Sequence, residues 1–223
     1  TRHPHLIIKF GGHAMAAGLS LPREEVEGYL ARVPFNQKGR RRFKAPKIPV
    51  PATISLETKG AMSTQNGFGK ILDDIAKAGG PLADRIVTTS PDVTVSTNLG
   101  PWVNRRGLFS MQGKEDVFKL RGLMSPQKWE MSPKGQHIEL GISEMNLFLL
   151  LGQLGLSWDL SEQPLIPIGT VYDPFVLRGL DAFVYSVYSG SRFVLAGTPS
   201  GVTLAPEGGA HQSTITPSIG LEL

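Results

Sequence analysis

The chain between residues 143 and 197 constrains the fold more than any other part of the sequence. Residues 143–156 predict a helix that is apolar on every side, and residues 174–189 predict a second helix. Short apolar runs at 165–171 and 193–197 predict strands. Apolar strands that alternate with helices indicate a parallel sheet covered on both faces. We therefore expect an α/β fold with helices on both faces of a parallel sheet, and we expect the helix at 143–156 to be buried.

A break in composition separates this region from the start of the chain. Four prolines fall between residues 34 and 58, and six Lys or Arg residues without an acid fall between Lys38 and Lys47. Such a stretch favours an extended linker over regular structure. We therefore divide the chain into a segment at 1–34 that ends a preceding domain, a linker at 35–61, and a main domain at 62–223 that is truncated at its C-terminus.

The remaining chain carries weaker patterns of regular structure. Strands are expected at residues 5–10 and 85–89, and helices at 22–32 and 64–78. Gly11 and Gly12 should end the first strand, and Ser63 or Thr64 should cap the second of these helices. Residues 98–135 are rich in Gly, Pro and charge, which predicts an irregular loop region.

Composition excludes several kinds of site. The chain has no cysteine, which rules out disulfides, thiolate zinc sites and a thiolate nucleophile. The longest apolar run, around Leu147 to Leu151, is far shorter than the roughly 20 residues that cross a bilayer. We therefore expect a protein without a membrane contact, in the cytoplasm.

Glu144 is the first candidate for chemistry. It stands at the start of the helix that is otherwise apolar on every side. A carboxylate in such surroundings is costly unless another group binds it, which favours a functional site. A second interpretation remains open, because a negative charge is also stabilising at a helix N-terminus without any ligand.

A second set of candidates follows the strand at 165–171. Tyr172, Phe175 and Arg178 are spaced by three, so they share one helical face near the end of a strand, where ligands of parallel sheets gather. The alternative is that the aromatic rings are core residues and that Arg178 pairs with Asp181. His211 lies in a glycine-rich loop and could transfer a proton near neutral pH, although a structural role is equally open.

Four short motifs occur in the order in which transketolase-like enzymes carry them. They are Ser90 to Leu99, Gly141-Ile142-Ser143-Glu144, the Tyr-x-x-Phe-x-x-Arg-Gly-x-Asp run from Tyr172 to Asp181, and Glu207-Gly208-Gly209-Ala210-His211-Gln212. Over residues 62–220 the chain resembles the pyrimidine-binding domain of thiamine-diphosphate enzymes, and in particular the homodimeric type of pyruvate dehydrogenase decarboxylating component. It departs from the family in the last motif, where Gly209-Ala210 replaces Pro-Thr and Glu207 stands where transketolases have Asp.

The resemblance implies a role for each candidate residue. Glu144 would bind a ring nitrogen of the aminopyrimidine of thiamine diphosphate and so activate the cofactor. Phe175 would stack on the pyrimidine, with Tyr172 and Arg178 lining the same pocket. His211 would face the substrate and move a proton. Asp92 would lie near the cofactor, without a defined role.

The resemblance also implies a reaction and partners. The expected reaction is decarboxylation of a 2-oxo acid, with transfer of the acyl group to a lipoyl-carrying acyltransferase component, in a homodimer. The Gly-Asp-Gly motif that holds magnesium and diphosphate in this family does not occur here, so a separate diphosphate-binding domain is expected to supply it. We expect the chain by itself to be an inactive fragment. Ketol transfer of the transketolase type is an alternative, although a sugar phosphate would find only Arg178 and Arg192 as cations beyond residue 136.

The N-terminal segment supports a different reading. Residues 7–21 resemble the Gly-Gly-His-Ala-x-Ala-Ala-Gly motif in the C-terminal, nucleic-acid-binding domain of exonucleases of the DHH phosphoesterase superfamily. The basic run from Lys38 to Lys47 could then contact phosphates, or it could be a solvated linker. A nucleic-acid-binding module is therefore a further alternative function.

Overall fold

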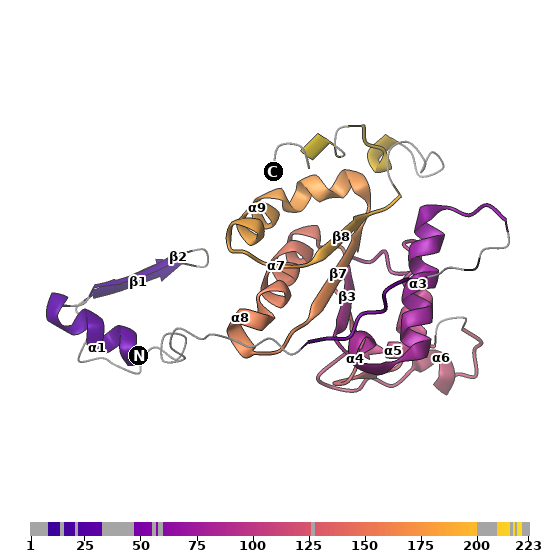
Figure 1. Cartoon of the computed structure of the whole chain (residues 1–223), viewed down its shortest axis with the longest axis horizontal. Helices are drawn as coiled ribbons and strands as arrows, with labels where there is room; N and C mark the ends of the chain where they lie inside the picture. The colour runs from indigo at the N-terminus through magenta and orange to yellow at the C-terminus, as the bar shows by residue number, and fades with distance from the viewer. Residues whose placement is uncertain are drawn as a thin grey trace. The chain divides into compact units, whose positions relative to one another are not determined.

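The computed structural model describes residues 9–13, 16–20, 22–32, 47–54, 57, 60–125, 128–199, 209–214, 216 and 218–219. The chain divides into two compact units, Thr1–Lys44 and Ala45–Leu223. We describe each unit by itself (Figure 1). None of the described helices is long and apolar enough to cross a membrane.

The N-terminal unit is built on a hairpin. Strand β1, Lys9–His13, pairs antiparallel with β2, Ala16–Ser20, and is followed by the 3-10 turn η1, Arg23–Glu25, and helix α1, Val26–Arg32. The prediction that Gly11 and Gly12 end the first strand is wrong, because Gly11 lies inside β1 opposite Gly18. Glycine disfavours a strand when it is judged from sequence, but here pairing with the opposite strand keeps Gly11 within β1. Residues 5–8 of the predicted strand lie outside the described residues.

The second unit contains one parallel sheet in the order β5-β4-β6-β3-β7-β8. Its strands are β3 (Ile86–Ser90), β4 (Leu108–Phe109), β5 (Met131–Ser132), β6 (His137–Glu139), β7 (Ile166–Val171) and β8 (Val194–Gly197). Every neighbouring pair is parallel. The predicted parallel sheet is therefore confirmed, with the three longest strands, β3, β7 and β8, next to one another.

Helices cover both faces of this sheet, as predicted (Figure 1). One layer holds α3 (Thr64–Ala78), the short α4 (Gly80–Ala83) and α5 (Gly100–Arg106). The other holds α7 (Glu144–Gly155), the short α8 (Ser157–Ser161) and α9 (Leu180–Tyr188). Each layer of helices packs around its own hydrophobic core. Trp102 and Leu99 are fully buried in the first, and Phe148 and Leu147 in the second.

Helix α3 follows its sequence signals closely. The Ser63 hydroxyl accepts a hydrogen bond from the Asn66 N–H at 3.2 Å, which satisfies one free donor of the first turn. Leu72 and Ala76 face the core, and Gly79 ends the helix with a φ of 68°. The predicted helix and its cap are therefore confirmed.

The region 98–135 is more regular than predicted. It contains α5, β4, β5 and a short helix α6 at Val117–Leu120. Pro101 lies in the first turn of α5 and Gly107 ends the helix, so residues that indicate loops also occur at helix boundaries. Strands β4 and β5 have two residues each, too few for an alternating pattern to show in sequence.

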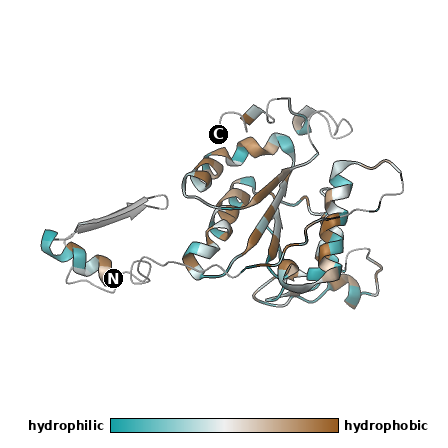
Figure 2. Cartoon of the chain, in the orientation of Figure 1, coloured by the Kyte–Doolittle hydropathy of each residue, from teal (hydrophilic) through white to brown (hydrophobic). Residues whose placement is uncertain are grey.

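Two helical predictions near the site need correction. Residues 174–189 do not form one α-helix, because a 3-10 helix, η2, runs over Asp173–Gly179 before α9 begins. Helix α7 is not buried on all sides. Its Leu147, Phe148 and Leu151 side chains are fully buried. Met145 and Leu149 are 41% and 53% exposed, because the sheet and α9 cover only one side of α7. Apolar colour on α7 and α9 is visible in Figure 2.

Candidate active site

The candidate residues lie where the parallel strands end. Glu144 begins α7 shortly after β6, and Tyr172 directly follows β7. The loop at 91–99, which carries Asp92, directly follows β3. The carboxyl ends of parallel strands meet at one edge of a sheet, and this edge is where α/β proteins bind ligands. The topology therefore gathers segments that are far apart in sequence.

Glu144 and Arg178 form the charged centre of the cluster. Arg178 Nη1 donates to Glu144 Oε1 at 3.0 Å. The Glu144 side chain is 8% exposed, whereas that of Arg178 is 53% exposed. A buried carboxylate requires such a partner, because burying an unpaired charge is costly. The alternative prediction paired Arg178 with Asp181, but in the structure Arg178 pairs with Glu144.

An aromatic ring contacts the same guanidinium. Arg178 Cζ lies 3.9 Å from the centre of the Phe175 ring, a cation–π contact. Phe175 and Arg178 belong to η2, and Tyr172 caps it. A 3-10 helix has three residues per turn, so positions spaced by three lie above one another. The sequence spacing therefore places all three side chains on one face, as expected, through a tighter helix than predicted.

His211 completes the cluster from the end of the chain. It lies in the short 3-10 helix η4, Gly209–His211, with its ring edge-on to Phe175 at 5.1 Å and to Tyr172 at 5.7 Å. Glu207 and Gly208 of the same motif lie outside the described residues. Tyr172 is also buried and Phe175 packs on the second core, so these aromatic residues serve packing as well.

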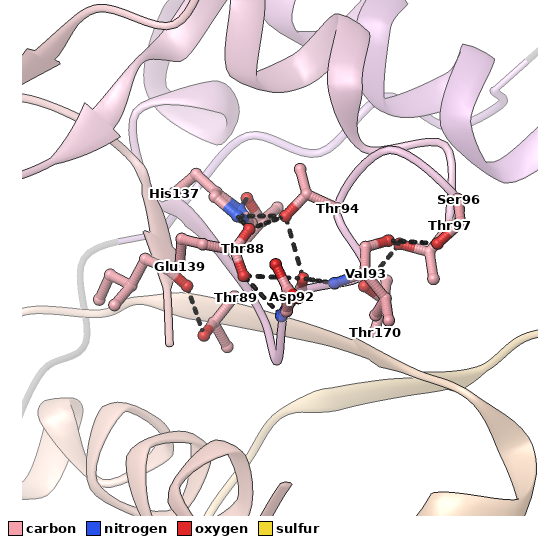
Figure 3. Close-up of polar contacts among 12 residues, drawn as sticks. Thr88, Thr89, Asp92, Val93, Thr94, Ser96, Thr97, His137, Glu139 and Thr170 are labelled. Carbon is pink, nitrogen blue, oxygen red and sulfur yellow. Dashed lines mark hydrogen bonds and ion pairs between the residues drawn. The ribbon is translucent and has the colours of Figure 1, made fainter. Parts of the chain in front are cut away.

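Asp92 lies instead in a polar network around Glu139 (Figure 3). Its backbone N–H donates to Glu139 Oε1 at 2.7 Å, and its side chain is exposed. Thr94 donates its hydroxyl proton to Glu139 Oε2, and His137 Nε2 lies 2.9 Å from Thr94 Oγ1. His137 is fully buried, with Nδ1 2.8 Å from the hydroxyl of Thr88.

Hydrogen-bond accounting assigns the role of one ring nitrogen of His137. The single proton of Thr94 is used for the Glu139 carboxylate, so Thr94 Oγ1 accepts from His137 Nε2–H. The other ring nitrogen, Nδ1, lies 2.8 Å from the Thr88 hydroxyl, which also donates to the Gln136 carbonyl oxygen at 3.5 Å. Burial by itself would raise the pKa of Glu139. The hydrogen bonds from His137, Thr94 and the Asp92 amide outweigh burial and hold the pKa of Glu139 below its ordinary value of 4.5. The network therefore keeps an ionised carboxylate at the sheet edge.

The loop at 91–99 links this network to the aromatic cluster. Tyr172 donates its hydroxyl proton to Ser96 Oγ at 2.7 Å, and the hydroxyls of Thr97 and Thr170 are 2.9 Å apart. Gln65 Nε2 from α3 donates to the Ser96 carbonyl oxygen. The sequence analysis missed Glu139, His137 and Gln65. A signal existed for two of them, since His137 and Glu139 are two residues apart on β6 and so share one face of the sheet.

Within the described part of the chain, no group of three or more His, Asp or Glu side chains could hold a metal ion. The residues that could hold an organic cofactor are those of the cluster, where the buried Glu144 carboxylate binds a guanidinium that lies over an aromatic ring.

The sheet order and the two helical layers define an α/β domain with a parallel sheet covered on both faces. Solved structures with this fold include the transketolase of Campylobacter jejuni, with a TM-score of 0.51 and 15% identity over 90% of this chain and 24% of that chain. The transketolase of Pichia stipitis aligns with a TM-score of 0.52 and 18% identity, covering 89% of this chain and 25% of the other. The likeness to these structures is one of fold.

A curated relative is similar in sequence as well. The chain is 27% identical over 185 residues to the pyruvate dehydrogenase E1 component of Pseudomonas aeruginosa, which covers 77% of this chain and 20% of the relative. The chain thus spans about a fifth of the length of that relative. No family model matches the chain.

Proposed function

We propose that this chain supplies the pyrimidine-binding part of a thiamine-diphosphate-dependent enzyme that decarboxylates a 2-oxo acid, with pyruvate as the first candidate. The acyl group would pass to a lipoyl carrier. The observation that carries this proposal is the buried carboxylate of Glu144 at the carboxyl edge of the sheet, bound to an Arg178 guanidinium that lies over the Phe175 ring. The similarity to a pyruvate dehydrogenase E1 component supports the same reaction class.

The present contacts of Arg178 support an aminopyrimidine as ligand. Its guanidinium is flat and cationic, lies over Phe175, and donates an N–H to Glu144. An aminopyrimidine ring is also flat and has adjacent ring and amino nitrogens, so it can stack on the same ring and bind the same carboxylate. Because Arg178 is half exposed, it can move aside for such a ligand. When bound, thiamine diphosphate supplies the electron sink for decarboxylation.

Charge favours a 2-oxo acid over a sugar phosphate. Residues 130–223 contain three Lys or Arg residues against nine Asp or Glu residues. A phosphate group needs cationic or N–H donors, and this part of the chain offers few cations. His211 lies against Phe175 and Tyr172, where it could donate a proton to a substrate held above the cofactor ring.

Two partners belong to this proposal. A diphosphate-binding domain would hold magnesium and the diphosphate group, because the Gly-Asp-Gly motif is not in this sequence. A second copy would cover apolar residues that remain exposed, among them Leu149 on α7 and Tyr185 and Tyr188 on α9.

The test replaces the carboxylate of Glu144 in the full-length protein that carries these residues. Glu144→Gln and Glu144→Ala should lower pyruvate-dependent turnover by roughly 100-fold or more, as expected when a group that governs proton transfer is lost. Thiamine diphosphate titration by calorimetry, together with turnover, measures the effect. Asp159→Asn, at an exposed acid on α8, is the matched control.

Normal turnover of Glu144→Ala would sink the proposal. The same preparation distinguishes the two thiamine-dependent reactions, because carbon dioxide release from pyruvate supports the dehydrogenase reading. Ketol transfer between sugar phosphates without that release would favour transketolase chemistry.

A further inference from the structure

Asp92 has an unusual backbone conformation at the edge of the candidate site. Its φ is +66°, in the left-handed region that residues other than glycine rarely adopt. Aspartate adopts this region more often than most residues, but the conformation is still uncommon, is fixed by neighbouring contacts, and concentrates at functional sites. The side chain of Asp92 is exposed, so the fixing contact must be made by its backbone.

Glu139 makes that contact. Its Oε1 accepts from the Asp92 N–H at 2.7 Å, a charge-assisted hydrogen bond. Its other oxygen is bound by Thr94, two residues further along the same loop, and lies 3.4 Å from His137 Nε2. One carboxylate therefore holds both the backbone and a side chain of the loop, and the buried His137 holds the carboxylate (Figure 3).

The far end of the loop is fixed to the candidate cofactor pocket. Ser96 accepts the hydroxyl proton of Tyr172 at 2.7 Å, and Thr97 contacts Thr170, which lies at the carboxyl end of β7. Gln65 binds the Ser96 carbonyl oxygen and accepts from Thr198 at 2.7 Å. Movement at Asp92 would consequently shift Ser96 and release the Tyr172 hydroxyl.

We propose that Glu139 is a positioning residue for the thiamine diphosphate pocket. It holds Asp92 in the left-handed conformation and thereby fixes the loop that orients Tyr172 beside Phe175 and His211. The inference rests on the proposed function for the identity of the ligand. The part that concerns the loop stands on the geometry of this chain.

The test is a double-mutant cycle in the full-length protein. Glu139→Ala removes the acceptor of the Asp92 N–H. We expect faster hydrogen exchange at the amides of residues 92–97 and about tenfold weaker thiamine diphosphate binding, as for the loss of one charge-assisted hydrogen bond. Saturating cofactor should restore most of the turnover, because Glu139 does not touch the reacting atoms.

The Asp92→Gly variant tests whether Glu139 acts by fixing the backbone of Asp92 or whether its loss disturbs the structure in general. Glycine adopts the left-handed conformation without strain, so it no longer depends on Glu139. Adding Glu139→Ala to Asp92→Gly should therefore weaken cofactor binding much less than Glu139→Ala does in the wild-type background. An equal loss in both backgrounds would overturn the proposal.

Two milder variants keep the test valid if Glu139→Ala folds poorly. Glu139→Gln retains the size of the side chain and one acceptor, and it should weaken cofactor binding by less than the alanine variant. Ser96→Ala cuts the link to Tyr172, and it should weaken binding while the Asp92 amide stays protected. Unchanged loop exchange and unchanged affinity in Glu139→Gln and Glu139→Ala would overturn the inference.

These outcomes are distinguishable from failure of the proposed function. If Glu144→Ala keeps normal turnover, the cofactor assignment fails. Hydrogen exchange over residues 92–97 still shows whether Glu139 holds the loop.

Discussion

The role of Glu144 depends on its ion pair with Arg178. In the sequence, Glu144 is compatible with a site or with an ordinary helix start. In the structure it is buried and bonded to Arg178, whose guanidinium lies over Phe175. The proposal requires that the half-exposed Arg178 gives way to another flat ligand that can donate a hydrogen bond to this carboxylate. This exchange is the chemical basis of the proposed cofactor site.

Glu139 gives the protein an acid-sensitive component of stability. Its pKa is lowered in the folded state, while the unfolded chain titrates near 4.5. The stabilisation is therefore complete above about pH 4.5 and is lost as the pH falls through the lower folded value. We expect Glu139→Gln to unfold with a weaker pH dependence than wild type in this acidic range. Urea unfolding of both proteins as a function of pH measures the difference.

Parallel pH curves for the two proteins would contradict this expectation. Glu130→Gln, at an exposed acid directly before β5, should retain the wild-type pH dependence and serves as the control.

At the scale of elements, the packing of η2 against α7 determines where the aromatic residues lie. Gly179 ends η2 directly over Phe148 of α7, and a Cβ atom there would lie 2.0 Å from Phe148 Cδ2. Phe148 is fully buried and cannot yield easily. The close approach allows η2 to place Arg178 within hydrogen-bonding distance of Glu144.

Gly179→Ala should therefore be destabilising. We expect a loss of about 1–3 kcal/mol in the free energy of unfolding, because added volume in a close-packed core forces a shift of Phe148 or of the backbone. Chemical denaturation measures it. Gly100→Ala is the control, since nothing lies within 4 Å of a Cβ atom at that position in the first turn of α5. Equal stability of the two variants would show that η2 does not depend on this contact.

Element predictions succeeded where the signal was local. The cap at Ser63 predicted the start of α3, and the runs at 85–89, 165–171 and 193–197 predicted the three central strands β3, β7 and β8. They failed for β4 and β5, which have two residues each and depend on pairing with distant strands. The 3-10 form of η2 was also missed, because its spacing of three is compatible with an α-helix.

At the scale of the molecule, the uncovered side of α9 supports association with a second copy. Val184, Tyr185 and Tyr188 are 42%, 69% and 85% exposed on a helix with a single charged residue. We expect Tyr185→Asp and Tyr188→Asp to weaken self-association of the full-length protein by placing charge in an apolar contact. Sedimentation velocity over a range of concentrations measures the change.

Leu160→Asp, on α8, is the matched control, because Leu160 is a comparably apolar but only 36% exposed residue of another helix. Unchanged association of the α9 variants would place the contact between copies elsewhere. It would leave the cofactor-site proposal intact, since that proposal rests on Glu144 and Phe175.

The sequence by itself determined the class of fold and the order of the candidate residues along the chain. Periodicity, caps and apolar runs are local properties, so they can be recognised in the sequence without knowledge of the tertiary contacts. Only the tertiary structure decided that Arg178 pairs with Glu144, that His211 packs on Phe175, and that Glu139 holds Asp92. These contacts join segments 34, 36 and 47 positions apart, and the parallel sheet brings them to one edge through pairings that no local pattern encodes.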